Sequence, residues 1–148
     1  MTSGAVLAGV YTHWGAQINS QSDIDSLLAM KTWAIVGLGN NPERAAYGVS
    51  KLLQDKGHRV IPVYPRAEIV HGEIGYKTLA EIPIPVDVVD CFVNSKLVGK
   101  VVDEAIAIGA KAVWLQLDVI DHDAVARAID AGLIAIMDRC PAIEYRNK

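Results

Sequence analysis

The spacing of apolar residues changes repeatedly along this chain after Lys31. Short, nearly continuous apolar stretches alternate with longer segments in which apolar positions recur at helical spacing. The short stretches are Trp33–Val36, Arg59–Val63, Val86–Val93, Ala112–Leu117 and Leu133–Met137. Apolar runs of this length, rich in β-branched residues, are typical of strands buried on both faces, as in a parallel sheet. The pattern therefore predicts that each of these stretches is a buried strand.

The segments between the strands predict amphipathic helices, each with one apolar face. They span Glu43–Lys56, Ser95–Ile108 and Asp121–Ala131, and a further helix is expected over Asp23–Lys31. A glycine follows each of the first three helices, namely Gly57, Gly109 and Gly132. Glycine adopts the left-handed conformation that ends a helix without steric cost, so the chain can turn directly into the next strand.

Repeated helix–glycine–strand units predict the topology. Parallel strands require crossover connections, and these are right-handed almost without exception. We therefore predict one α/β domain over residues 23–148, with a Rossmann-like, doubly wound, mainly parallel five-stranded sheet and helices on both faces. Residues 1–22 are interpreted as an N-terminal tail that packs on the domain or on a partner subunit. Ala67–Tyr76 is expected to be an irregular excursion after the second strand.

The composition excludes several classes of protein. The chain has 148 residues, 51% of them hydrophobic and 21% charged, as in an ordinary globular domain. A net charge of −3 offers no global electrostatic case for nucleic-acid binding. No apolar run approaches the ~20 residues of a membrane-spanning helix, and the N-terminus lacks the features of a signal peptide. With only two cysteines, a disulfide framework is not expected, so we predict a cytoplasmic protein.

The loop after the first predicted strand carries the clearest chemical pattern. In doubly wound sheets, ligands bind beyond the carboxyl ends of the strands. Gly37 and Gly39 in this loop allow the backbone to approach a phosphate closely, and Asn40 and Asn41 tolerate unusual turn conformations.

The start of the following helix adds to this predicted anion site. Pro42 is expected in the first helical turn, where its missing N–H costs nothing. The unpaired N–H groups and the positive dipole end of a helix favour an anion. Arg44 is expected to add a charge-assisted contact.

The end of the second predicted strand narrows the choice of cofactor. An NAD-binding fingerprint has a third glycine where Pro42 stands and an acidic residue at the end of the second strand. Here Tyr64, Pro65 and Arg66 follow that strand instead. Arginine cannot accept hydrogen bonds from a ribose diol, but it pairs well with a ribose phosphate. NAD is therefore disfavoured, whereas NADP and coenzyme A both stay open. The alternative is that Arg66 is simply a solvated surface residue.

Several segments together carry a family resemblance. They are GLGNNPERAAYGV at Gly37–Val49, VIPVYPR at Val60–Arg66, VDVVDCFV at Val86–Val93, AIAIGAKAVWLQLD at Ala105–Asp118 and MDRCP at Met137–Pro141. Their order and spacing make the chain, from Thr32 to Ala142, resemble the CoA-binding Rossmann domain family in its small stand-alone form. It is more distantly similar to the CoA-binding domain of the succinyl-CoA synthetase α subunit and related acyl-CoA ligases.

The resemblance implies that the cofactor is coenzyme A or an acyl-CoA. It implies that the turn at Gly37–Asn41 contacts phosphates, that Arg66 lies near the ribose phosphate, and that the later loops line the pantetheine and adenine side. The expected cofactor-binding residues are Gly37, Leu38, Gly39, Asn40, Asn41, Arg44, Tyr64, Pro65, Arg66, Phe92, Asn94, Ser95, Gln116 and Leu117. Stand-alone members often carry Pro-Ser where this chain has Ala45 and Ala46, so no hydroxyl contact is expected there.

No set of residues has a recognisable catalytic spacing. Cys140 is interpreted either as a thiol activated by Arg139 or as a buried structural cysteine, and Cys91 as a core residue. A polar cluster at the ligand edge is compatible with a metal site, although Asp121 is also a natural helix N-cap. That cluster comprises Asp118, Asp121, His122, Asp123 and Asp138. We predict neither a catalytic residue nor a metal ligand.

The function that these observations favour is a small CoA-binding protein without catalysis of its own, acting as a carrier, sensor or regulator. The alternatives are an NADP-dependent oxidoreductase and a CoA-binding subunit of a larger acyl-CoA ligase. A homo-oligomer or a ligase partner chain also stays open. The hypothesis predicts a locally positive rim, formed by Arg44, Arg66, Lys96 and Arg139.

Overall fold

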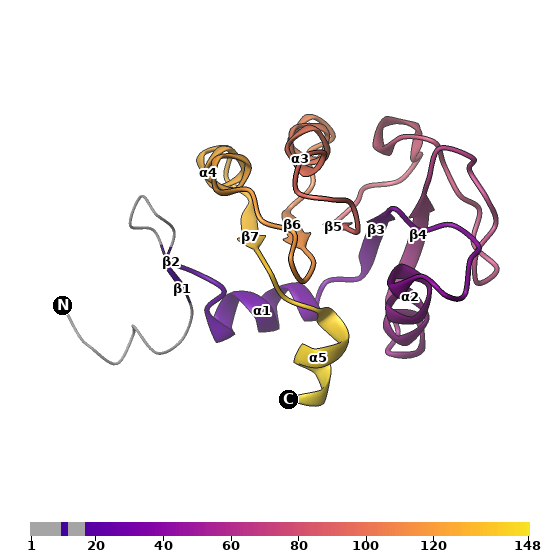
Figure 1. The fold of residues 1–148 in the computed structure, drawn as a ribbon, viewed down its shortest axis with the longest axis horizontal. Coiled ribbons are helices and arrows are strands. Elements are labelled where there is room, and N and C mark those ends of the chain that lie inside the picture. Colours follow the sequence, from indigo (N-terminus) through magenta and orange to yellow (C-terminus); the bar gives the residue numbers. More distant parts are fainter. Residues whose placement is uncertain (1–9, 12–16) are drawn as a thin grey trace.

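A five-stranded parallel sheet forms the centre of the computed structural model, which describes residues 10–11 and 17–148 (Figure 1). The spatial order of the strands is β4-β3-β5-β6-β7. Their bounds are β3 (Thr32–Val36), β4 (Arg59–Val63), β5 (Val88–Cys91), β6 (Ala112–Leu115) and β7 (Ile134–Ile136). All five coincide with predicted strands, and the doubly wound α/β architecture is confirmed.

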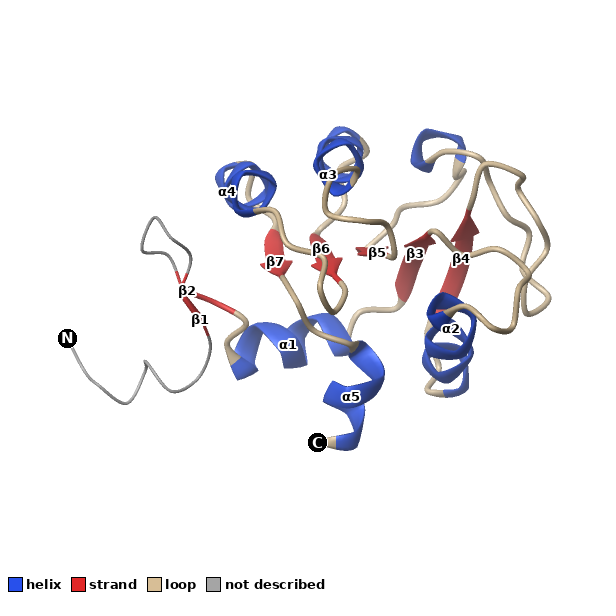
Figure 2. Cartoon of the chain, in the orientation of Figure 1, coloured by secondary structure: helices blue, strands red, loops and turns tan. Residues whose placement is uncertain are grey.

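Helices cover both faces of the sheet (Figure 2). Helices α3 (Val98–Ala107) and α4 (His122–Asp130) lie on one face, together with the short 3-10 turn η2 (Leu79–Glu81). Helices α1 (Gln21–Leu28), α2 (Ala45–Asp55) and α5 (Pro141–Arg146) lie on the other. Neither α5 nor η2 was predicted from the sequence, because both are too short to develop an apolar periodicity.

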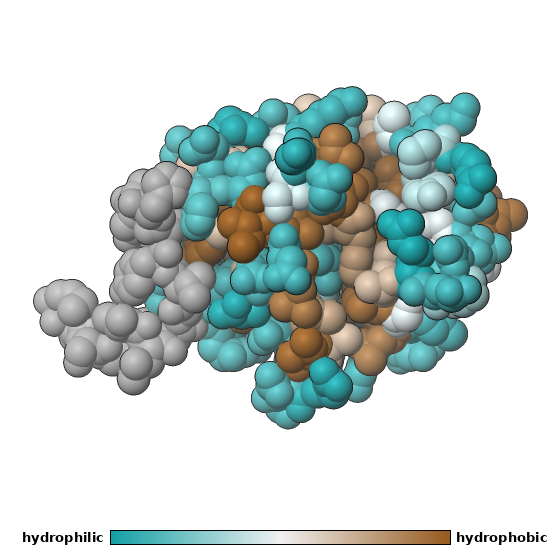
Figure 3. Space-filling model, viewed as in Figure 1, coloured by the Kyte–Doolittle hydropathy of each residue, from teal (hydrophilic) through white to brown (hydrophobic). Residues whose placement is uncertain are grey.

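The core forms two apolar layers, one on each face of the sheet. Alternate residues of a strand point to opposite faces, so Trp33 contributes to the layer under α1 and α2, whereas Ala34 contributes to the layer under α3 and α4. Trp33 and Trp114 are both fully buried, with ring centroids 5.7 Å apart. On the outside, hydrophilic residues border an apolar centre on the face seen in Figure 3.

Hydrogen bonds fix the segment before α1 to the end of β7, the strand at one edge of the sheet. Strands β1 (Val10–Tyr11) and β2 (Gln17–Ile18) pair antiparallel, and the side chain of Ile18 is buried in the core. The buried Asn19 side chain donates a hydrogen bond to the Met137 carbonyl at 2.7 Å and accepts one from the Met137 N–H at 2.9 Å. Most of the predicted tail, including His13, lies outside the described residues.

Helix α1 begins earlier and ends earlier than predicted, at Gln21 and Leu28 instead of Asp23 and Lys31. The side chain of Ser20 accepts a hydrogen bond from the Asp23 N–H at 3.1 Å and caps the helix. Among the described residues, no helix is long and apolar enough to cross a membrane.

Replacing Asn19 by alanine should destabilise the domain by about 2–3 kcal/mol, because the N–H and carbonyl of Met137 would be left buried without their partners. The measurement is urea unfolding followed by tryptophan fluorescence. The control is Asn147→Ala at the exposed end of α5, which should leave the transition within ~0.5 kcal/mol. Equal effects of the two substitutions would contradict the role assigned to Asn19.

Candidate functional site

The order of the strands reverses at β3, whose neighbours are β4 on one side and β5 on the other. In doubly wound sheets a crevice opens at this point, beyond the carboxyl ends of the strands. Here the backbone at Gly37, after β3, touches the backbone at Phe92, after β5. A Cβ at Gly37 would collide with the Phe92 carbonyl oxygen, and Gly37 has a φ of +100°, which side chains rarely adopt. Only glycine fits this position.

The turn after β3 presents backbone N–H groups at the edge of the sheet. The Gly37 N–H donates to the Val63 carbonyl at 2.8 Å, which ties the turn to the end of β4. Helix α2 then begins at Ala45, and its N-cap residue, Arg44, makes no side-chain cap hydrogen bond. The Tyr47 N–H donates to the Arg44 carbonyl at 3.1 Å, whereas the N–H groups of Ala45 and Ala46, the first two residues of α2, have no acceptor within the described part of the chain.

The predicted place of Pro42 in the first helical turn is wrong, because α2 starts after it. The side chain of Asn41 accepts a hydrogen bond from the Glu43 N–H at 3.0 Å, and its carbonyl accepts one from the Arg44 N–H at 3.1 Å. These bonds form a separate turn, because asparagine side chains compete with helical hydrogen bonding. Pro42 belongs to that turn, and the helix begins after it.

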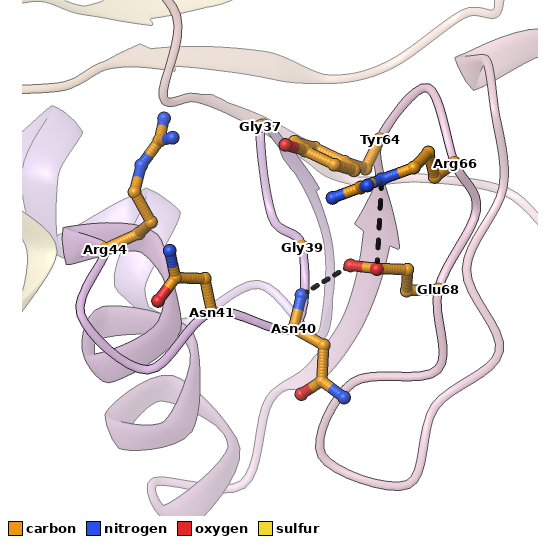
Figure 4. Close-up of a pocket in the computed structure, with 8 residues that line it drawn as sticks. All are labelled: Gly37, Gly39, Asn40, Asn41, Arg44, Tyr64, Arg66 and Glu68. Atoms are coloured by element: carbon orange, nitrogen blue, oxygen red, sulfur yellow. Dashed lines mark hydrogen bonds and ion pairs between the residues drawn. The ribbon is translucent and has the colours of Figure 1, made fainter.

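A first hollow joins this turn to the loop after β4 (Figure 4). The guanidinium carbon of Arg66 lies 5.8 Å from the ring centroid of Tyr64, and the Arg66 side chain is 75% exposed. Glu68, which was not predicted, also lies here, and its carboxylate accepts a hydrogen bond from the Asn40 N–H at 2.7 Å. The lining residues are Gly37, Gly39, Asn40, Asn41, Arg44, Tyr64, Arg66 and Glu68.

Two further hollows open from the same point. A cleft of about 580 Å³ lies between the ends of β3, β4 and β5 and the start of α3, lined by apolar residues such as Val63 and Phe92 and by the polar Asn94. A smaller hollow lies at the end of β6, with Gln116 and Leu117 in its wall. Gly37 and Arg44 line all three hollows.

The described residues thus bring nearly all of the expected cofactor-binding residues to one edge of the sheet. Leu38 differs, because its side chain is fully buried in the core and only its backbone belongs to the turn. Ser95 also differs, since its hydroxyl accepts a hydrogen bond from the Ile120 N–H at 2.9 Å and lies 3.2 Å from the Asp118 carbonyl. This side chain fixes the loop between β6 and α4.

The charges at the edge differ in part from the predicted rim. Arg44 and Arg66 line the hollows as expected, but Lys77 and Lys100 stand there in place of the predicted Lys96 and Arg139. Glu68 and Glu104 add negative charge to the same walls.

The residues that suggested catalysis or metal binding have structural surroundings. Asp121 caps α4, as predicted, by accepting a hydrogen bond from the Ala124 N–H at 3.0 Å. Asp138 accepts one from the Asp118 N–H at 2.8 Å. Over residues 10–11 and 17–148 no group of three or more His, Cys, Asp or Glu side chains is placed to hold a metal ion.

Cys91 is fully buried, and burial raises the pKa of its thiol, whereas Cys140 is half-buried at the start of α5.

The buried Asp90 lies next to the site but was not among the predicted site residues. It lies in β5 with no exposed surface, and one carboxyl oxygen accepts a hydrogen bond from the Gln116 side chain at 2.6 Å. Its other oxygen has no hydrogen-bond partner within the described part of the chain. Burial raises the pKa of Asp90 to about 8, so the carboxyl group is mostly protonated at neutral pH. Asp90 thereby holds Gln116 in place under the smaller hollow.

The comparisons with known proteins agree with this geometry. Residues 31–146 match the family described as CoA binding domain. The chain is also 33% identical over 127 residues to the uncharacterized protein YneT of Bacillus subtilis (strain 168), covering 85% of this chain and 94% of that protein. The chain belongs to the CoA-binding domain family.

Two other similar proteins are a chain of comparable length and a much longer ligase subunit. A hypothetical protein from Pyrococcus horikoshii OT3 has a solved structure that matches with a TM-score of 0.81 and 39% identity, covering 85% of this chain and 89% of that one. The alpha subunit of the ADP-forming acetate–CoA ligase II of Pyrococcus furiosus is 37% identical over 81 residues, which are 54% of this chain and 18% of that subunit. The predicted family and the predicted likeness to CoA ligases are confirmed.

Replacing Asp90 by asparagine should change how stability depends on pH. Since folding raises the Asp90 pKa from 3.8 to about 8, the native state holds a proton that the unfolded state releases, and the wild type loses stability as pH rises between these values. Asparagine has no such proton. The free energy of unfolding of the variant should therefore rise relative to wild type between pH 4 and 8, by up to a few kcal/mol.

Urea unfolding at several pH values measures this difference. The control is Asp130→Asn, at the exposed end of α4, for which the difference from wild type should stay flat. A flat difference for Asp90→Asn as well would show that this carboxyl group titrates normally.

Proposed function

We propose that this protein holds coenzyme A or an acyl-CoA at the carboxyl edge of its sheet and catalyses no reaction of its own, as a carrier, sensor or regulatory protein. One observation carries the proposal: a polar hollow at the glycine-containing turn and a mostly apolar cleft meet at Gly37 and Arg44. Coenzyme A has this composition, with a triply phosphorylated adenosine at one end and an uncharged pantetheine arm at the other.

The anionic end of the ligand is assigned to the turn after β3. Gly39, Asn40 and Asn41 line the first hollow, and the first two residues of α2, Ala45 and Ala46, line the smaller hollow beside it. A helix N-terminus favours phosphate. Arg44 and Arg66 stand on opposite sides of that hollow (Figure 4) and supply positive charge. In this assignment Arg66 contacts the phosphate on the ribose.

The pantetheine arm is assigned to the cleft of about 580 Å³, which falls within the usual size of small-molecule sites. Val36, Val63 and Leu79 give this cleft apolar walls, and Asn94 and Thr78 offer polar groups to the two amides of the arm.

NADP is the competing ligand, because its 2′-phosphate would also suit Arg66. That assignment depends on the single arginine, whereas the match to the CoA-binding family extends over residues 31–146.

The likeness to a subunit of an acetate–CoA ligase favours a second candidate role, as a CoA-binding subunit that docks on larger ligase chains. Co-purification of a ligase chain with the tagged protein would support that role.

Isothermal titration of the purified protein with CoA, acetyl-CoA, NADPH and NAD tests the proposal. We expect CoA and acetyl-CoA to bind and both nicotinamide cofactors to bind far more weakly. Binding of NADPH without binding of CoA would overturn the proposal in favour of a reductase.

Replacing Arg66 by glutamate should weaken CoA binding far more than it weakens the binding of dephospho-CoA, which lacks the ribose phosphate. Losing one charge-assisted contact and adding repulsion should cost on the order of 2 kcal/mol, about 30-fold in Kd. Arg146→Glu, an equal change of charge at the exposed end of α5, is the control and should affect neither ligand. Equal losses for the two ligands in Arg66→Glu would remove Arg66 from its assigned role.

A further inference from the structure

Glu68 occupies the position where an anionic ligand is expected. One oxygen of its carboxylate accepts a hydrogen bond from the Asn40 N–H at 2.7 Å, and the other lies 4.0 Å from the Arg66 side-chain nitrogen. Figure 4 shows the carboxylate between these two donors, at the mouth of the hollow. A ribose or pyrophosphate group bound to the same turn would need the same amide and the same guanidinium.

The surrounding chain is built to allow this contact. A Cβ at Gly39 would stand only 2.9 Å from the Glu68 carboxylate, so the glycine makes room for it. Gly75 packs against the Glu68 backbone, where a Cβ would collide with the Glu68 carbonyl oxygen. The loop is further held by hydrogen bonds between Val70 and Glu73 at 2.9 and 3.0 Å. The backbone of Glu68 is therefore held in place, while its side chain is 32% exposed, so solvent lies beside the carboxylate.

We propose that Glu68 is an internal competitor for the phosphate-binding turn. This inference rests on the proposed function. In the free protein the carboxylate takes the place of a phosphate on the Asn40 amide, and it must swing away when the phosphorylated end of CoA binds. The negative charge next to the turn then lowers the affinity for the ligand, so that Glu68 sets how tightly the site holds CoA.

A different role would give the opposite result. In dinucleotide-binding proteins an acidic residue beyond the second strand accepts hydrogen bonds from ribose hydroxyls. If Glu68 stayed in place and read the ribose in this way, its removal would weaken binding instead of strengthening it.

The experiment compares CoA binding by wild type and Glu68→Gln, using isothermal titration at the same pH and salt. Glutamine keeps the size of the side chain and removes its charge. We expect CoA to bind roughly three- to tenfold more tightly to the variant, because a charge that repels the phosphates and competes for the Asn40 amide is removed. Adenosine 3′,5′-bisphosphate, which carries the phosphates without pantetheine, should gain by a similar factor.

The control is Glu73→Gln in the same loop. The Glu73 carboxylate lies 3.9 Å from the Arg59 side-chain nitrogen, and Glu73 lines a different hollow. This substitution should leave the Kd for CoA unchanged. Circular dichroism checks that each variant is folded, and Glu68→Ala provides a second variant with the same expected gain. Suppose that the wild type binds CoA and that both Glu68 variants bind it equally well or more weakly. The competitor role of Glu68 would then be wrong, but the proposed function would stand. If neither the wild type nor the variants bound CoA, both the proposed function and the competitor role of Glu68 would be wrong.

Discussion

The backbone contact between Gly37 and Phe92 is the constraint on which the ligand edge depends. Strands β3 and β5 are neighbours, but the chain leaves β3 for α2 on one face of the sheet and leaves β5 for α3 on the other. The two loops diverge from a common point, and the space between them is the crevice that Rossmann-like sheets offer to ligands. Any side chain at Gly37 would force these loops apart.

The electrostatics of the edge combine a charged surface with a neutral interior. The chain has a net charge of −3, yet Arg44, Arg66 and two lysines line the hollows. Beneath this surface Asp90 is buried with a raised pKa, and it orients Gln116 without presenting a full negative charge to an anionic ligand at neutral pH. Glu68 and Glu104 do carry negative charge at this edge, and the partly exposed carboxylate of Glu68 accepts a hydrogen bond directly from the turn.

The sequence predicted the strands and the long helices well, because buried parallel strands and amphipathic helices have distinct periodicities. Element ends were less predictable, since side-chain hydrogen bonds decide them. Asn94 accepts hydrogen bonds from the N–H groups of Lys96 and Leu97, so α3 begins at Val98 and not at Ser95. Ser20 similarly starts α1 before Asp23.

Among the unpredicted residues of the candidate site, Glu68 and Asp90 show why the sequence alone could not place them. Glu68 lies in an irregular loop whose path depends on backbone pairing between Val63 and Tyr76, which no local pattern encodes. Asp90 lies within the stretch predicted as a buried strand, and only the three-dimensional register brings Gln116 to it. The turn at Gly37–Asn41, by contrast, was recognisable because glycine and asparagine mark its backbone directly.

The most direct test of the account is an NMR titration of the isotopically labelled protein with CoA, following backbone amide shifts. If CoA binds at the turn, the amides of Gly39, Asn40 and Asn41 should shift and saturate together, while amides at the opposite edge, such as that of His58, should keep their positions. Binding that leaves the turn amides unmoved and shifts another surface would contradict it.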